Sequence, residues 1–344
     1  MSSPVTIADI ARQAGVGTAT VDRVLNERPG VNAETTQKVM AAVKALGEPT
    51  VLRGRPRMRD GFRFAYVLPD GSSPFFDQVE RQIAQAAGDF RHQHITEVTY
   101  RLPAADPAQF AAALAALGNC DGIALLAPDL PAVKVAVNDK VRAGVHVVTL
   151  FSDVAGSMRS AYVGVDNRAA GRTAGLLLGR MAGPAPRDTL LLLSQATRLS
   201  AEIERRVGFV QVIEERFGAL RVVRVPDLPD DDRGVQQQFA QYLHSEMDLA
   251  RLAGIYCVGI GSSAVVQALR ELGLAQAQGL AAHDCTAAHQ AMLSQGEMAY
   301  VLQQDIHYCV LTAARVLRGL CDNVRGALSV VQPRIEILTA ENLH

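Results

Sequence analysis

The sequence predicts an α/β protein with a small three-helix head and a larger body built on parallel sheets. Three observations support this prediction. Residues 5–46 repeat apolar side chains every three or four positions, the period of helices that bury one face. From residue 62 onward, short apolar runs alternate with longer amphipathic segments, which is typical of parallel sheets covered by helices. An arginine-rich segment at 50–61 separates the two patterns.

The first helix of the head is expected to begin after Thr6. Thr6 and Asp9 have the spacing of a capping box, with Asp in place of the usual Glu. Gly15 is expected to end this helix, because glycine tolerates the left-handed conformation of a C-cap. A second helix is expected over 18–26. Its inward side chains are those of Val21, Val24 and Leu25.

Asn32 is expected to cap a third helix, which Gly47 and Pro49 end. The apolar stripe predicted for this helix consists of Val39, Met40, Val43 and Leu46. Two short helices joined by a glycine-containing turn are the helix-turn-helix arrangement. The alternative is an ordinary three-helix fragment that binds another partner or nothing.

Specific residues of the head favour the first interpretation. They run without a gap through Thr6-Ile7-Ala8-Asp9-Ile10-Ala11, Ala14-Gly15-Val16, Thr20-Val21, Arg23-Val24-Leu25-Asn26, Val31, Thr35 and Val39. This order closely resembles the DNA-binding domain of the lactose-repressor (LacI/GalR) family. In that family the start of the second helix reads bases in the major groove. The resemblance therefore implies DNA contacts from Thr6, Thr18, Ala19, Thr20, Asp22, Arg23 and Asn26.

The chemistry of these side chains suits base and phosphate contacts. Thr18 can exchange a hydrogen bond with a base, Ala19 offers a methyl group to thymine, and Arg23 can fork onto guanine or a phosphate. Thr6, at a helix N-terminus, can hold a phosphate oxygen. Two positions depart from the family pattern, because Gly17 and Asp22 stand where serines are common. Asp22 would repel phosphate, but its carboxylate can accept from the amino group of cytosine.

The net charge of −1 conceals an asymmetry. Nine basic and five acidic residues up to residue 59 leave the head and linker at +4, so the rest carries −5. A basic end on an acidic body is the electrostatic footprint of a DNA-binding module joined to a separate sensing body. The chain is 49% hydrophobic and 20% charged, which predicts a folded protein and not a disordered one.

Other classes of protein find no support in the sequence. No apolar run is long enough to span a membrane, and the N-terminus has no signal-peptide core, so a cytoplasmic protein is expected. The five cysteines have neither C-x-x-C nor zinc spacing, and no metal or cofactor is expected.

The segment 50–61 is predicted to be a basic linker that contains Arg53, Gly54, Arg55 and Pro56. The lactose-repressor family normally carries a hinge helix here, but Gly54 and Pro56 disfavour helix. One interpretation is a solvated linker that makes nonspecific phosphate contacts. The other is an extended Arg-Gly-Arg resembling the core of an AT-hook, which places Arg53 and Arg55 in a narrow A·T minor groove.

The body is expected to alternate strands and helices. The predicted strands cover 64–68, 97–100, 122–126, 145–150, 162–165, 190–193, 221–225, 254–258, 280–283, 299–303 and 334–338. The predicted helices cover 76–90, 107–117, 133–143, 167–181, 205–217, 234–243, 264–272 and 306–320. This pattern argues for two parallel sheets facing one another across a cleft.

Several short motifs of the body carry a second resemblance. They are Ser73-Pro74-Phe75-Phe76, Tyr162-Val163-Gly164-Val165-Asp166-Asn167 with Ala170-Gly171-Arg172, Arg205 ahead of Gly208-Phe209, and Gln304-Asp305. The body resembles the type I periplasmic-binding-protein fold, which the lactose-repressor family uses as its sensor. The resemblance implies a head at 1–49, a linker at 50–61 and a body at 62–344. It divides the body into an N-lobe (about 62–164 and 305–330) and a C-lobe (about 165–303 and 331–344).

Ligands of such folds sit at the carboxyl ends of strands. The candidate ligand-binding residues are Ser73, Phe75, Phe76, Asp153, Asp166, Arg205, Asp284 and Gln304. The phenylalanines either stack on a sugar ring or fill the core, and the aspartates either accept from hydroxyl groups or cap helices. Arg205 either bridges hydroxyl groups or forms a surface ion pair with Glu202. Carboxylates, amides, one arginine and phenylalanine favour a neutral sugar or polyol.

The sequence therefore predicts a transcriptional regulator, most simply the repressor of a sugar or polyol catabolic operon, and not an enzyme. It would bind a pseudo-palindromic operator as a homodimer, with a small molecule in the cleft changing its affinity for DNA. The alternative is a kinase-like, carbohydrate-modifying enzyme with a DNA-binding head. The adjacent His283 and Asp284 could serve as catalytic residues, but the sequence contains no nucleophile elbow and no phosphate-binding loop.

Overall fold

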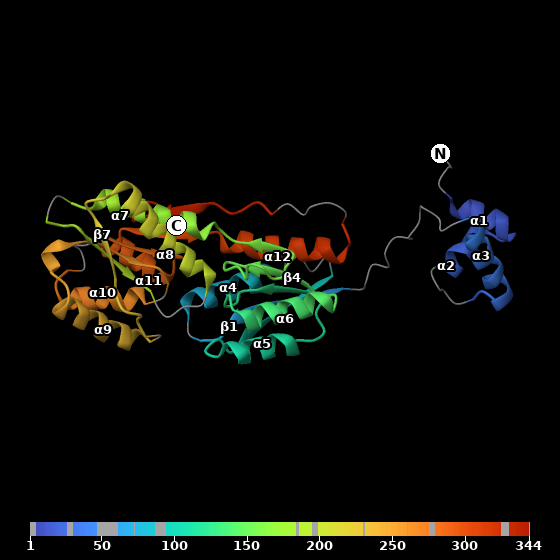
Figure 1. Cartoon of the computed structure of the whole chain (residues 1–344), viewed down its shortest axis with the longest axis horizontal. Helices are drawn as coiled ribbons and strands as arrows, with labels where there is room; N and C mark the ends of the chain where they lie inside the picture. Colours follow the sequence, from blue (N-terminus) through green and yellow to red (C-terminus); the bar gives the residue numbers. More distant parts are fainter. Residues whose placement is uncertain are drawn as a thin grey trace. The chain divides into compact units, whose positions relative to one another are not determined.

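The computed structural model describes most of the chain in two compact units, Met1–Gly61 and Phe62–His344, called here the head and the body (Figure 1). The described residues are 5–25, 30–46, 61–71, 73–86, 94–183, 186–194, 199–229, 231–259, 261–274, 279–324 and 330–343. Asn26 and the linker arginines Arg53 and Arg55 lie outside these ranges.

The head contains the three predicted helices. They are α1 (Ile7–Ala14), α2 (Thr18–Leu25) and α3 (Ala33–Leu46). The capping box is confirmed, since Asp9 N donates to Thr6 Oγ1 and Thr6 N donates to Asp9 Oδ2. Gly15 ends α1 with a φ of 65°, and Asn32 Oδ1 accepts from Thr35 N at the start of α3.

The apolar stripe predicted for α3 is partly wrong. Val39 and Val43 are buried, but Met40 is 53% exposed and Leu46 is 38% exposed. Ala42 takes an inward place instead. Val39, Ala42 and Val43 are spaced by three and four positions, so they share one face of α3. Met40 lies at the side of that face and outside the core.

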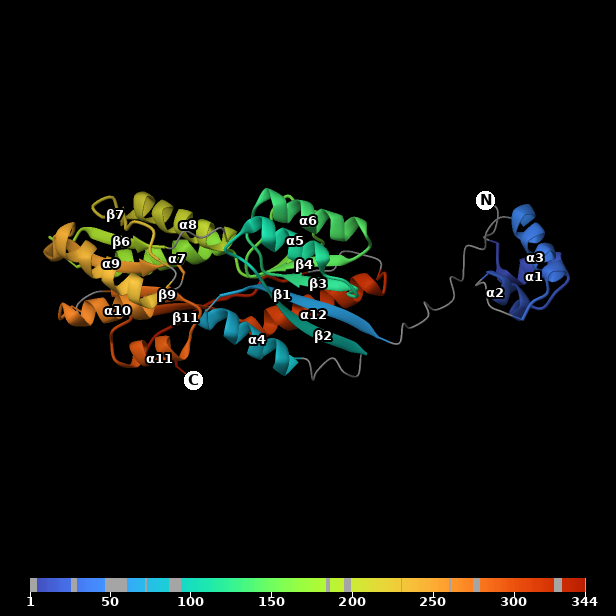
Figure 2. The ribbon, with the colours of Figure 1, turned by 90° about the horizontal axis from the view of Figure 1, so that it is seen from below.

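The N-lobe of the body is a five-stranded parallel sheet with the strand order β2-β1-β3-β4-β5. Its strands are β1 (Phe62–Pro69), β2 (Ile95–Leu102), β3 (Gly122–Leu125), β4 (His146–Leu150) and β5 (Ala161–Val163). Its helices are α4 (Pro74–Ala86), α5 (Pro107–Ala116), α6 (Pro131–Arg142) and α12 (Ile306–Cys321). Side chains of α4 and α12 bury one face of the sheet, and those of α5 and α6 bury the other (Figure 2).

The C-lobe is a six-stranded sheet with the order β11-β10-β9-β8-β6-β7. Its strands are β6 (Thr189–Leu193), β7 (Arg221–Arg224), β8 (Leu252–Cys257), β9 (Gly279–His283), β10 (Tyr300–Gln304) and β11 (Ile335–Leu338). Its α-helices are α7 (Asn167–Met181), α8 (Ser200–Arg216), α9 (Asp232–Ser245), α10 (Ser262–Glu271) and α11 (Ala287–Ser294). Leu190 and Leu192 face α7 and α8, whereas Leu191 and Leu193 face the other helices, as alternation along a strand requires.

The chain passes between the two sheets at three points. It leaves the N-lobe between β5 and α7, returns between β10 and α12, and leaves again between α12 and β11. The strand β11 pairs antiparallel with β10, so the C-lobe sheet is not parallel throughout as the alternation had suggested. The reason is the third passage, which brings the chain back from the N-lobe in the opposite direction.

Two helices differ most from the prediction. The helix α8 begins at Ser200 and not at 205, and its first turn includes the buried Ala201. Ala201 and Ile203 are too few to establish a helical stripe in the sequence. The helix α11 was not predicted at all. Its N-cap Thr286 forms a capping box in which His289 replaces the usual acidic residue.

Candidate functional site

The helices α7 and α8 pack unusually closely at the edge of the C-lobe. A β-carbon on Gly171 would lie 1.9 Å from the carbonyl oxygen of Arg205, and one on Gly208 would lie 2.1 Å from that of Arg168. Only glycine allows two helix backbones to approach to this distance. The contact sets the second turn of α8, which carries Arg205, against the start of α7.

The side chain of Arg205 is buried, with 6% exposed, and it joins three segments of the C-lobe. Its Nε donates to Asn167 Oδ1 at 2.9 Å, and Nη1 lies 3.5 Å from the carbonyl oxygen of Val258. Its Nη2 lies 3.7 Å from Asp284 Oδ2. This burial rules out the alternative of a surface ion pair with Glu202.

Asp284 follows β9 in the left-handed conformation, with a φ of 57°, and is 7% exposed. Burial raises the pKa of its carboxyl group, and Arg205 partly offsets this effect. Gln304, at the end of β10, donates from Nε2 to Asp284 Oδ1 at 3.0 Å. A non-glycine residue in this conformation is strained, and such residues concentrate at functional sites.

The other end of the Gln304 amide has no partner among the described residues. Gln304 is 2% exposed, and its Oε1 accepts no hydrogen bond. A buried acceptor without a donor typically costs about 1–3 kcal/mol. Arg205, Asp284 and Gln304 therefore form a polar cluster with one hydrogen-bonding position unused.

The N-lobe contributes an aromatic wall beside this cluster. Phe151 follows β4 with a φ of 59°, and the Phe75 ring meets it edge-on with centroids 5.4 Å apart. Asn167 Nδ2 donates to the carbonyl oxygen of Phe151 at 3.1 Å and to the hydroxyl group of Tyr162 at 3.0 Å. Asn167 thus connects Arg205 of the C-lobe to the N-lobe, a link that the sequence did not suggest.

The lobes are also joined by a pair of serines that the sequence did not single out. Ser152 Oγ accepts from Ala201 N at 3.3 Å, and Ser200 Oγ donates to the carbonyl oxygen of Asp153 at 2.7 Å. Ser152 directly precedes the predicted site residue Asp153, but nothing in the spacing of either serine marks it. The space lined by Arg205, His283, Asp284 and Gln304 has no room for a water molecule.

Other candidate ligand residues have structural partners. Burial opposes ionisation of Asp153, but hydrogen bonds from Arg159 and Thr149 outweigh it and lower the pKa of Asp153. Asp166 is exposed and caps α7, accepting from Ala169 N at 2.9 Å. Ser73 is buried, and its Oγ lies 3.4 Å from Phe76 N in the first turn of α4. Phe76 lies under the guanidinium of Arg101.

In the head, the outer face of α2 is open. Thr18, Ala19 and Arg23 are exposed, Thr20 and Asp22 are half-buried, and Val21 is buried against the other helices. Thr6 is also exposed, but its hydroxyl group already donates to Asp9 Oδ2 at 2.6 Å. The start of α2 is thus free to meet a groove, while its inner face holds the head together.

Comparison with known proteins decides the family. Residues 64–323, more than half of the chain, match the periplasmic binding protein domain. The chain belongs to the periplasmic binding protein domain family. In this family member, residues 6–47 also match the lacI family of bacterial regulatory proteins, so its head is a lacI-family helix-turn-helix domain. Both predicted resemblances are confirmed.

Solved structures of binding proteins share the fold of the body. A solute binding protein of an ABC transporter from Burkholderia graminis, solved with D-arabinose, has a TM-score of 0.74 at 20% identity, covering 85% of this chain and 98% of that one. The glucose-galactose binding protein GanP from Geobacillus stearothermophilus has a TM-score of 0.71 at 17% identity, covering 82% and 99%. At these identities the likeness establishes the fold alone.

A curated relative is a regulator. The HTH-type transcriptional regulator MalR from Streptomyces coelicolor is 45% identical over 80 residues, which make up 23% of this chain and 23% of MalR. The chain therefore matches less than a quarter of the length of MalR.

No helix within the described ranges is long and apolar enough to cross a membrane. Within the same ranges, no three His, Cys, Asp or Glu side chains are grouped so as to hold a metal ion.

Proposed function

We propose that this protein is a sequence-specific, DNA-binding transcriptional regulator whose affinity for its operator changes when a sugar or polyol binds between the lobes of the body. The simplest regulator of this kind is a cytoplasmic repressor of a catabolic operon. It acts as a homodimer, because two heads on a pseudo-palindromic site read matching half-sites about one DNA turn apart.

The lacI-family match of the head supports the DNA-binding part, as does the similarity to MalR, an HTH-type transcriptional regulator. We assign base contacts to Thr18, Ala19, Thr20, Asp22, Arg23 and Asn26, with Thr6, Arg53 and Arg55 on the backbone or minor groove. The exposed side chains at the start of α2 support this assignment.

The unused acceptor of Gln304 is the observation that carries the ligand part. A hydroxyl group of a sugar can donate to Gln304 Oε1 while neighbouring hydroxyl groups meet Asp284 and Arg205. Phe75 and Phe76 offer the apolar face on which a sugar ring packs. Asp153, Asp166 and Ser73 could contact the sugar only if their present hydrogen bonds were broken.

Gln304 is also placed to report on the ligand. It ends β10 in the C-lobe, and the chain enters the N-lobe directly after it, at the start of α12. A ligand that binds Gln304 and Phe75 together favours one arrangement of the lobes. It can shift DNA affinity only through its different affinities for the two arrangements, typically about 1–3 kcal/mol or 5- to 150-fold.

An enzymatic role has less support. The histidines beside Asp284 are already engaged, His283 with the hydroxyl group of Tyr256 and His289 with that of Ser262. The relatives that the chain matches in sequence are named as regulators.

The test begins with an operator selected by the full-length protein from random DNA. Its affinity is then measured with and without D-arabinose, glucose, galactose and a series of polyols. We expect at least one of them to change the affinity 5-fold or more. Arg205→Gln and Gln304→Leu should remove this response and leave affinity without sugar unchanged.

Arg216→Gln serves as the matched control, because Arg216 lies exposed in the last turn of α8, away from the cluster. It should respond like the wild type. Full response in both Arg205→Gln and Gln304→Leu would show that the pocket is wrongly assigned. Failure to select any DNA sequence would contradict the regulator itself.

A further inference from the structure

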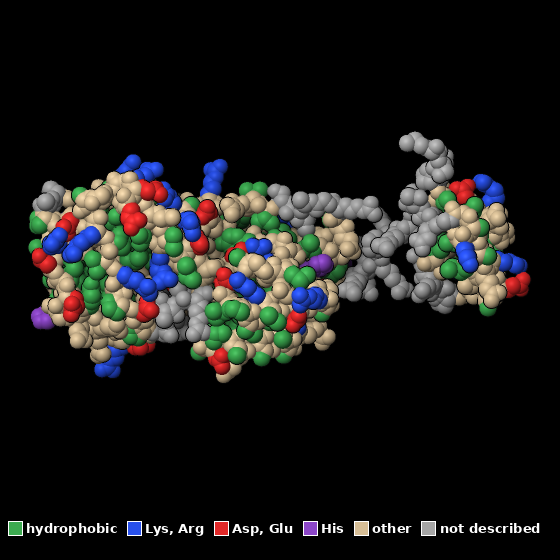
Figure 3. Space-filling model, in the orientation of Figure 1, with side chains coloured by type: hydrophobic (Ala, Val, Ile, Leu, Met, Phe, Trp, Pro, Cys, Tyr) green, Lys and Arg blue, Asp and Glu red, His purple; other side chains and the backbone are tan. Residues whose placement is uncertain are grey.

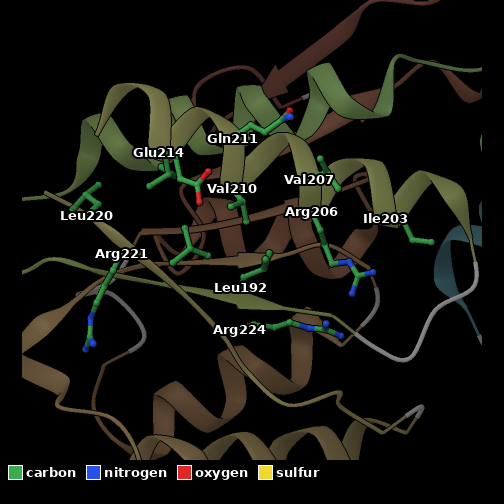
Figure 4. Close-up of a pocket in the computed structure, with 12 residues that line it drawn as sticks. Leu192, Ile203, Arg206, Val207, Val210, Gln211, Glu214, Leu220, Arg221 and Arg224 are labelled. Carbon is green, nitrogen blue, oxygen red and sulfur yellow. The ribbon is translucent and has the colours of Figure 1, made fainter. Parts of the chain in front are cut away.

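A second hollow lies on the C-lobe, away from the cluster around Arg205. It runs between the outer face of α8 and the edge strand β7, with a volume of about 630 Å³ (Figure 4). This volume is within the range of about 300–1,000 Å³ that is usual for small-molecule sites. We call it the α8/β7 groove.

The floor of the α8/β7 groove is apolar. Its lining includes Val207 and Val210 of α8, Val222 of β7 and Leu192 of β6. Val207 is 36% exposed, and Ile203 at the same end of the helix is 39% exposed. The helix α8 contacts the edge strand β7, and α7 lies over the middle strands β8 and β9, so these side chains lie at the edge of the sheet, partly open to solvent.

One end of the groove is cationic. Figure 4 shows the guanidinium ends of Arg206, from α8, and Arg224, from β7, at the same end of the groove. Arg224 pairs with Asp227. Arg206 makes a long hydrogen bond of 3.5 Å to Ser194 Oγ, and no carboxylate of the described residues forms an ion pair with it. A guanidinium beside an apolar surface, without an acidic partner, favours an anion.

The acidic lining residue, Glu214, lies at the other end, where the basic residue Arg221 also lies. Glu214 follows Arg206 by eight residues on α8, which corresponds to about 12 Å along the helix. The groove is therefore cationic at one end and apolar in the middle. Figure 3 shows basic side chains next to hydrophobic ones on the face of the body that carries α8.

We propose that the α8/β7 groove is a second ligand site, which binds a small amphipathic anion. The anionic head lies against Arg206 and Arg224, and the apolar body covers Val207, Val210 and Val222. A sugar does not suit this groove, because its hydroxyl groups would find few polar partners on the floor. The two sites are separate in chemistry: the cluster around Arg205 suits hydroxyl groups, and the groove suits an alkyl or aryl carboxylate or phosphate.

The test uses decanoate as the probe, below its micelle concentration, with the full-length protein in a calorimeter. Saturable binding with one site per chain is expected. Decyl phosphate should bind as well, whereas the neutral 1-decanol should bind at least about tenfold more weakly, since hydrogen bonds to charged groups are the strong ones.

Two surface variants locate the site. Arg206→Gln removes the guanidinium that has no carboxylate partner within the described ranges, and Val207→Asp places a carboxylate on the floor at a position that is already partly exposed. Each should weaken decanoate binding about tenfold or more. Arg216→Gln, which removes the same charge from the same helix outside the groove, should bind decanoate like the wild type. Circular dichroism checks that each variant is folded.

Three results would overturn the proposal: no saturable binding of decanoate or decyl phosphate, unchanged binding in both groove variants, or equal binding of decanoate and 1-decanol. Arg205→Gln separates this proposal from the proposed function. If decanoate binding depends on Arg205 and not on Arg206, the anion occupies the site between the lobes and the groove is not a site.

Discussion

Gly171 of α7 and Arg205 of α8 lie so close that a β-carbon on the glycine would be 1.9 Å from the arginine's carbonyl oxygen. The side chain of Arg205 extends from this contact to Asn167 and Asp284. The position of the arginine therefore depends on a glycine that touches no ligand itself.

Gly171→Ala should destabilise the body and weaken the response to sugar. The added methyl group must push α8 away, and overpacking of this kind costs about 1–3 kcal/mol or more. Urea unfolding of the full-length protein measures the loss. Gly218→Ala is the control, because nothing lies within 4 Å of a β-carbon there. Equal stability of the two variants would show that α7 and α8 can separate at little cost.

Asp22→Ser should change which operators the head prefers. The carboxylate can accept from a cytosine amino group and repels phosphate, so its loss should raise affinity overall and relax selection for cytosine by about 1–3 kcal/mol. Selection from random DNA measures both effects. Glu34→Gln removes an acidic charge from an exposed i,i+4 pair with Lys38 and should leave base preference unchanged. Identical selected sequences for Asp22→Ser and the wild type would refute the base contact.

Arg53→Ala combined with Arg55→Ala should weaken binding chiefly on operators with an A·T-rich centre. A narrow A·T minor groove concentrates negative potential and holds arginine side chains deeply. Binding is measured on operators that differ only in their central base pairs, with the pair Arg57→Ala and Arg59→Ala as control. An equal loss on G·C-rich centres would indicate plain phosphate contacts instead.

The free energy of unfolding should fall as the pH is lowered from about 7.5 to 5.5, across the ordinary histidine pKa. Burial lowers the pKa of His283 and of His289, so both take up a proton less readily in the folded state than in the unfolded chain. The unfolded chain takes up these protons below about pH 6.5, which favours unfolding by at most about 1.4 kcal/mol per pH unit for each histidine. Asp284, whose pKa is raised by burial, acts in the opposite sense in more acidic solution.

Urea unfolding at several pH values tests this dependence. His289→Gln should flatten the slope, because glutamine keeps a polar group near Ser262 but does not titrate. His244→Gln, at an exposed position of α9, should leave the slope unchanged. A slope that does not respond to His289→Gln would mean that other groups dominate the titration.

Most elements of the fold could be predicted because their signals are local. The helix α7 begins and ends where the sequence predicted, since Asp166 provides its cap and its apolar side chains keep the helical period. The helices that were misjudged lack such signals. The first turn of α8 offers only Ala201 and Ile203 as apolar side chains, and α11 is short, with a histidine where the capping box usually has an acidic residue.

The site could be predicted only as a set of residue types. Asp153, Asp166 and Asp284 each follow a strand and look alike in the sequence. Asp153 forms an ion pair with Arg159, Asp166 caps a helix, and Asp284 is buried beside Arg205. The partner of each aspartate depends on which loops meet in space. The residues at the end of a single strand do not determine that.

By itself the sequence determined the order of the elements, the lacI-family head and the type of body, because periodicity, caps and short motifs are properties of neighbouring residues. Only the tertiary structure decided which polar groups converge. Arg205, Asp284 and Gln304 come from three separate segments, and the glycine contact between α7 and α8 brings the arginine to the other two. The structure also decided that α8 contacts the edge strand β7, with the groove beside Arg206 between them. The convergence at Arg205 follows from how closely two helices approach, which is a property of the packed pair and not of either helix.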